Sequence, residues 1–67
     1  MSEKAVAAAV EQFVKKVSFS TQREMERVIR MALADGKLRG DETFTAAVTV
    51  SSEKVGLNTT IYSKVEL

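Results

Sequence analysis

The spacing of the apolar residues changes once along this 67-residue chain, at Asp41. Before Asp41, apolar residues recur every three or four positions, which places side chains on one face of a helix. After Asp41, they alternate with polar residues, as in a strand with one covered face and one face in water. The change of period therefore predicts an α+β protein in which helical sequence precedes strands.

Two amphipathic helices are predicted before Asp41. Residues 3–17 form the first, with Ser2 as its N-cap, because serine at this position accepts a hydrogen bond from a free backbone N–H. The sequence Ser18-Phe19-Ser20 is expected to interrupt the helix. The apolar stripe of this first helix consists of Val6, Val10, Phe13, Val14 and Val17.

The second helix is expected to begin at Thr21. Thr21 and Glu24 have the spacing of a capping box, and Phe19 can fold against Met25 as a hydrophobic staple does. Gly36 is the expected end, because glycine accepts the left-handed conformation that follows many helices. The apolar stripe of this helix consists of Met25, Val28, Ile29, Ala32 and Leu33.

Two alternating segments follow, residues 43–51 and 57–67. The connector between them, residues 52–56, is polar and contains a glycine, and its length suits an antiparallel hairpin. The alternation assigns one strand face to Phe44, Ala46, Val48 and Val50 in the first segment, and to Leu57, Thr59, Ile61, Ser63, Val65 and Leu67 in the second.

These elements predict a single α+β domain, residues 1–67, in which two amphipathic helices pack on an antiparallel β-hairpin in the order α-α-β-β. A two-stranded sheet leaves two unpaired edges, which proteins usually cover, charge or pair. Residues 17–19 are a candidate for a short extra strand on one edge. A second copy of the chain can pair the other edge, so we expect a homodimer through strand edges, with a monomer as the alternative because domains of this size also fold alone.

The chain contains no histidine and no cysteine. Nucleophilic sites of the Ser-His-Asp or Cys-His kind, imidazole bases, and zinc or iron–sulfur centres of ordinary ligation are thereby excluded. A domain this small also has little volume for a concave pocket. We therefore expect no enzyme, no cofactor and no metal site, and we interpret Tyr62, Lys64 and the carboxylates as solvated surface groups.

The most suggestive charged feature is a basic stripe on the predicted second helix, formed by Arg23, Arg27 and Arg30, whose spacings of four and three residues place them on one face. Ten basic and nine acidic side chains give a net charge of only +1, so composition makes no case for a polyanionic partner. Glu24 and Glu26 also stand close enough along the helix to compensate part of the stripe. A solvated, ion-paired helix face is the favoured interpretation, and nucleic-acid binding with the hairpin as a wing is the alternative. In the nucleic-acid alternative, the residues that contact the nucleic acid would be Arg23, Arg27, Arg30, Lys37 and Arg39.

The segment 35–42 holds the densest charge in the chain. Asp35, Asp41 and Glu42 could surround a cation, and the Gly36-Lys37 step could hold phosphate, but the spacings of calcium loops and phosphate-binding loops are absent. A helix end followed by a turn into a strand explains the segment more simply.

Two observations bear on localisation. The apolar run of residues 5–10 is shorter than the apolar part of an export signal and is preceded by Glu3. No segment approaches the length of a membrane span. We expect a cytoplasmic protein without membrane contact.

Residues 13–42 resemble the central block of a small family of uncharacterised bacterial proteins. The best-matching portions are residues 15–17, 21–24 and 36–38 with Gly40 and Glu42, and residues 56–57 and 65–67 also fit. This resemblance implies a bacterial, cytoplasmic protein and transfers no functional residues, because the family has no assigned activity. From the residues themselves we expect a small, non-enzymatic module that binds another protein or itself.

Overall fold

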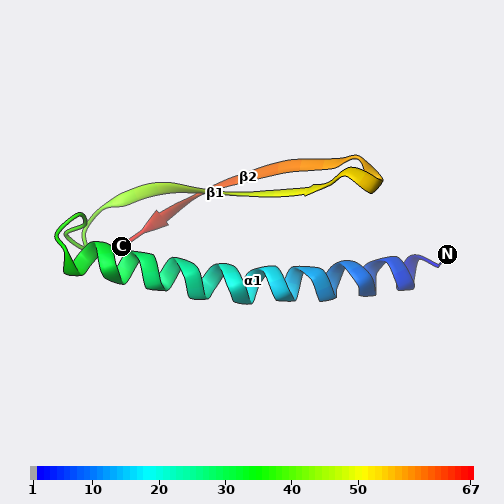
Figure 1. Cartoon of the computed structure of the whole chain (residues 1–67), viewed down its shortest axis with the longest axis horizontal. Helices are drawn as coiled ribbons and strands as arrows, with labels where there is room; N and C mark the ends of the chain where they lie inside the picture. Colours follow the sequence, from blue (N-terminus) through cyan, green and yellow to red (C-terminus); the bar gives the residue numbers. More distant parts are fainter. Residues whose placement is uncertain (1) are drawn as a thin grey trace. The chain divides into compact units, whose positions relative to one another are not determined.

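The structure is a computed structural model that describes residues 2–67. It contains the helix α1 (Glu3–Ala34), the strands β1 (Thr43–Ser52) and β2 (Leu57–Glu66), and a 3₁₀ turn, η1 (Glu53–Val55), between the strands (Figure 1). The chain divides into a helical unit that ends at Lys37 and a hairpin unit that begins at Leu38. The predicted α+β class is confirmed.

The prediction of two helices is wrong, because α1 runs without a break through Ser18-Phe19-Ser20 (Figure 1). The extra strand expected at residues 17–19 is wrong for the same reason. Serine and phenylalanine cost only about 0.5 kcal/mol each relative to alanine inside a helix, and neither glycine nor proline interrupts the segment. The half-buried residues Val17, Thr21, Met25 and Ile29 follow one another at intervals of four, so one helix face continues across the expected break.

Both ends of α1 lie close to the predicted positions. The side-chain oxygen of Ser2 accepts a hydrogen bond from the Ala5 N–H at 3.1 Å, which confirms Ser2 as the N-cap. At the other end the N–H of the C-cap residue Asp35 donates to the Met31 carbonyl at 2.9 Å. Gly36 follows with φ 83°, the left-handed conformation for which glycine was predicted at this end of the helix.

The capping box and hydrophobic staple predicted around Thr21 depend on a helix start that α1 does not have. Thr21 lies inside the helix, and the Glu24 carboxylate accepts hydrogen bonds from the Arg27 guanidinium. Phe19 and Met25 are six residues apart on one continuous helix and therefore point in different directions, because only residues three or four apart face each other.

The hairpin has the predicted antiparallel pairing. Its register runs from Thr43 opposite Glu66 to Ser52 opposite Leu57. Directly opposed residues share a face, so the even-numbered residues of β1 and the odd-numbered residues of β2 lie together, as the alternation predicted. On the other face the Thr49 and Thr60 hydroxyl groups are hydrogen bonded at 3.0 Å.

The turn between the strands is closed by η1 and Gly56. The Gly56 N–H donates to the Glu53 carbonyl at 3.2 Å, and Gly56 has φ 67°. This left-handed conformation is strained for residues with a Cβ atom, which explains the glycine that the connector contains.

No described residue is buried, and many large apolar side chains are exposed. Phe13 is 53% exposed and Phe19 is 64% exposed on α1, and Ile61 is 60% exposed on β2. Neither a single helix nor a two-stranded sheet can enclose apolar side chains by itself. Neither unit therefore contains a hydrophobic core of its own.

Candidate functional surfaces

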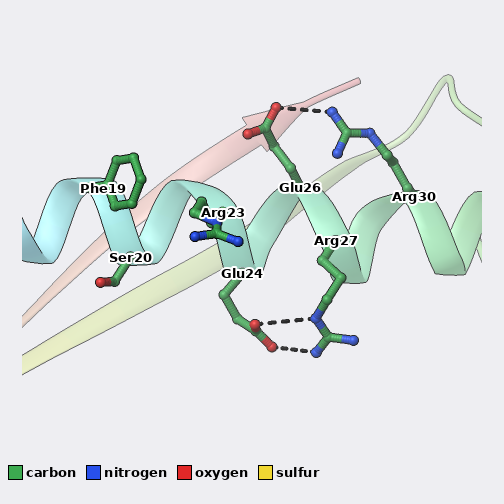
Figure 2. A pocket seen from close by; sticks show the side chains of 7 residues that line it. All are labelled: Phe19, Ser20, Arg23, Glu24, Glu26, Arg27 and Arg30. Carbon is green, nitrogen blue, oxygen red and sulfur yellow. Dashed lines mark hydrogen bonds and ion pairs between the residues drawn. The ribbon is translucent and has the colours of Figure 1, made fainter.

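The predicted basic stripe lies along one stretch of α1. Figure 2 shows a shallow surface depression there, whose lining side chains all belong to this helix. Arg23, Arg27 and Arg30 come from successive turns, as their spacing predicted. The depression lies between neighbouring side chains of a single element and is lined by Phe19, Ser20, Arg23, Glu24, Glu26, Arg27 and Arg30.

Arg27 is engaged within the helix. Its guanidinium donates two hydrogen bonds to the Glu24 carboxylate (Figure 2), one of them from Nε at 3.2 Å. A third contact joins Arg27 Nη1 to the Met31 sulfur at 3.4 Å. The hydrogen bonds from Arg27 are the main reason that the pKa of Glu24 is lowered, and the positive charge of Arg27 is the second reason. The same two interactions with Glu24 raise the pKa of Arg27. Because both side chains are more than half exposed, water screens the pair and its contribution to stability is small.

The other two arginines of the stripe are also in contact with neighbours one turn away. Arg30 Nη2 lies 3.1 Å from Glu26 Oε1 (Figure 2). The Arg23 guanidinium lies over the Phe19 ring, 5.7 Å from its centre, at cation–π distance. The two ion pairs follow the spacing that the sequence indicated, whereas the contact with Phe19 was missed, although its four-residue spacing could have revealed it.

Lys37 and Arg39 belong to different units of the chain. The Lys37 backbone N–H donates to Asp35 Oδ1 at 3.1 Å, which stabilises the turn after α1. In the hairpin unit, Arg39 Nε lies 3.7 Å from Asp41 Oδ1, and the Arg39 backbone N–H donates to the Glu42 carboxylate. All three carboxylates of this segment therefore take part in local contacts.

The described residues contain no group of three or more acidic side chains arranged to hold a metal ion. In the same part of the chain, no helix has an apolar stretch long enough to cross a membrane.

A second surface is the free edge of β1. The sequence predicts two unpaired strand edges but does not assign the contact with a second copy to one of the two strands. The Leu67 N–H donates to the Glu42 carbonyl at 3.0 Å, which extends the register of the hairpin by one hydrogen-bonded pair. Such pairs alternate with non-bonded pairs along an antiparallel ladder. The backbone N–H and C=O groups of the even-numbered β1 residues are therefore hydrogen bonded to β2. The N–H and C=O groups that point outward, away from β2, belong to Thr43, Thr45, Ala47, Thr49 and Ser51.

Fold and surfaces together define a small α+β protein with large exposed apolar side chains on its helix and, within the described residues, a β1 edge that pairs with no other strand. Residues 1–67 match a family of unknown function, DUF6494, and the chain belongs to this family. This match confirms the resemblance to a family without an assigned activity. Comparison with curated proteins and comparison with solved structures each gave no match.

Proposed function

We propose that this protein is a non-enzymatic interaction module that associates with a second copy of itself, as a homodimer through strand edges. The observation that carries the proposal is the absence of any buried apolar side chain among the described residues, together with the exposure of many large ones. No described residue is buried, although both units carry large apolar groups on one face.

Exposure of this kind favours association because burying one large apolar side chain contributes about 1.5–3 kcal/mol. On the apolar face of the hairpin, Val48 lies opposite Ile61, and Ile61 is 60% exposed. On α1, Val10 and Phe13 are 54% and 53% exposed. Large exposed apolar patches on small proteins are typical of interaction surfaces.

The net charge is compatible with a second copy as the partner. The chain has a net charge of only +1, so two copies approach without strong repulsion. The nucleic-acid alternative has less support, because Arg27 and Arg30 already contact Glu24 and Glu26. It makes a distinct prediction, namely that duplex DNA is retarded at low salt and that Arg27→Glu weakens the retardation.

The test is the mass of the protein in solution. Sedimentation equilibrium between about 1 and 500 μM is expected to give twice the chain mass of 7.4 kDa at the upper end. Because association stabilises the folded state, the melting temperature should also rise with protein concentration. A species of 7.4 kDa at every concentration would refute self-association.

Two neighbouring residues of β2 offer a matched pair of variants. Ile61 lies on the apolar face, opposite Val48, whereas Tyr62 lies on the other face, opposite Ala47. Both are well exposed, at 60% and 71%. If association also covers the apolar face beyond the paired edges, Ile61→Thr should weaken the dimer while Tyr62→Thr leaves it unchanged. Threonine suits a strand at both positions, so neither substitution should disrupt the hairpin itself. Equal effects of the two substitutions would argue against burial of the apolar face on association.

A further inference from the structure

The two strands of the hairpin differ in how well their free edges are protected. Charged side chains and proline discourage the pairing of exposed edges. β2 carries Lys64 and Glu66, whereas the ten residues of β1 include no charge, no proline and no glycine. Within the described residues β1 pairs only with β2, so its second edge is unpaired.

We propose that β1 pairs antiparallel with β1 of a second copy, around a two-fold axis at Ala47. This inference rests on the proposed self-association and specifies which edge and which register carry it. The result is a four-stranded sheet in the order β2-β1-β1-β2, with an uncharged pair of strands at its centre.

The backbone of β1 selects this register. Its outward groups belong to the odd-numbered residues from Thr43 to Ser51, and Ala47 is the middle one. With the axis at Ala47, Thr43 lies opposite Ser51 of the partner subunit, and Thr45 lies opposite Thr49 of the partner subunit. Every outward N–H and C=O then has a partner, whereas any shifted register leaves some of them unpaired.

The side chains of β1 are complementary to themselves in the same register. Phe44 lies opposite Val50 of the partner subunit, and Ala46 lies opposite Val48 of the partner subunit. The apolar residues therefore meet on one face, with a large side chain beside a small one, and no like charges oppose each other. A strand that matches its own reverse in charge, face and hydrogen bonding favours a second copy over an unrelated chain.

Replacing Thr49 with proline tests whether the free edge of β1 forms the contact between the two copies. The Thr49 N–H points away from β2, so proline there blocks the free edge and spares the hairpin ladder. Thr60 is the matched control, because it lies directly opposite, shares the hydroxyl pair and faces the other edge. Thr49→Pro removes two intersubunit hydrogen bonds per dimer and should raise the dissociation constant at least about tenfold. Thr60→Pro should leave the constant within about twofold.

Single cysteines test the register, since the chain has no cysteine of its own. The two Ala47 Cα atoms would be about 5.5 Å apart across the axis, within the range of a disulfide. Ala47→Cys should therefore cross-link completely in oxidised glutathione, whereas Tyr62→Cys, opposite it on β2, should remain largely uncross-linked at the same protein concentration.

The outcomes separate the two proposals. A monomeric wild type refutes the proposed function together with this inference. A dimeric wild type that Thr49→Pro leaves intact preserves self-association and overturns the β1 edge. If Thr60→Pro dissociates the dimer and Thr49→Pro does not, or if Tyr62→Cys cross-links better than Ala47→Cys, the contact between the copies belongs to β2. Either result overturns the proposed pairing of β1 with β1. A proline variant that lost its hairpin would be recognised by NMR, and the cysteine pair would then decide.

Discussion

The continuity of α1 can be tested at Gln22, where one helix and two helices predict opposite results. In the two-helix interpretation, Thr21 is an N-cap and Gln22 is the first helical residue, a position that favours proline. In the structure, Gln22 lies in the middle of α1, where its N–H donates to the carbonyl four residues earlier, that of Ser18. Gln22→Pro is therefore the discriminating substitution.

The expected magnitude follows from the chemistry of proline. In a continuous helix the substitution removes one hydrogen bond and brings the ring against the Ser18 carbonyl, at a cost of about 3 kcal/mol. The folding equilibrium constant should then fall by about two orders of magnitude, since 1.4 kcal/mol corresponds to a factor of ten. Gln22→Ala removes the same side chain but keeps the N–H, and its effect should remain within about 0.5 kcal/mol.

Urea denaturation, followed by far-ultraviolet circular dichroism, measures the free energy of unfolding of both variants and of the wild type. All three are compared at one protein concentration, so that association does not bias the comparison. The Cα chemical shifts of residues 16–24 should be helical in the wild type and in Gln22→Ala. Equal stability of Gln22→Pro and Gln22→Ala, or non-helical shifts at residues 18–20 of the wild type, would refute a continuous α1.

Three further predictions concern the ends of the elements and the ion pair. Ser2→Ala should destabilise α1 by about 1 kcal/mol and speed amide exchange at Ala5, whereas Ser2→Asp should retain the cap. Gly56→Ala should destabilise the hairpin by about 1 kcal/mol in thermal melts and Gly56→Asn by less; no heavy atom lies within 4 Å of the added Cβ, so the cost is backbone strain at φ 67°. In a carboxyl NMR titration, Arg27→Gln should raise the pKa of Glu24 toward its ordinary value. Because the folded-state pKa is lowered, the pair stabilises the wild type above the ordinary glutamate range, and this contribution is lost as the pH falls through the lowered pKa.

The hairpin could be predicted almost completely from the sequence. Its face assignment needs only a two-residue period, and Phe44 and Val65 fall on the same side because that period has a single solution. The glycine at position 56 indicated the turn, and Gly36 indicated the end of the helix. The strand faces, the turn and the helix end each depend on the identity of one or two neighbouring residues, and they can therefore be predicted without knowledge of tertiary contacts.

The number of helices could not be predicted in the same way. Thr21 and Glu24 have the spacing of a capping box, but that spacing also occurs inside helices, where Glu24 instead pairs with Arg27. Whether a capping box forms depends on whether the preceding residues leave the helix, and Ser18-Phe19-Ser20 contains no residue that forces them to do so. A local start signal without a stop signal before it is therefore insufficient to divide a helix.

The β1 edge shows which information sequence alone lacked. The absence of charge in residues 43–52 is visible in the sequence and identifies β1 as the less protected strand. The sequence does not show which residues of β1 have N–H and C=O groups that point away from β2. The same assignment of side chains to faces is compatible with the odd-numbered residues and with the even-numbered ones. One hydrogen bond, from the Leu67 N–H to the Glu42 carbonyl, decides between the sets and places Ala47 at the centre of the outward groups. If Thr49→Pro disrupts the dimer while Val48→Pro instead disrupts the hairpin, this direction is verified independently of the register.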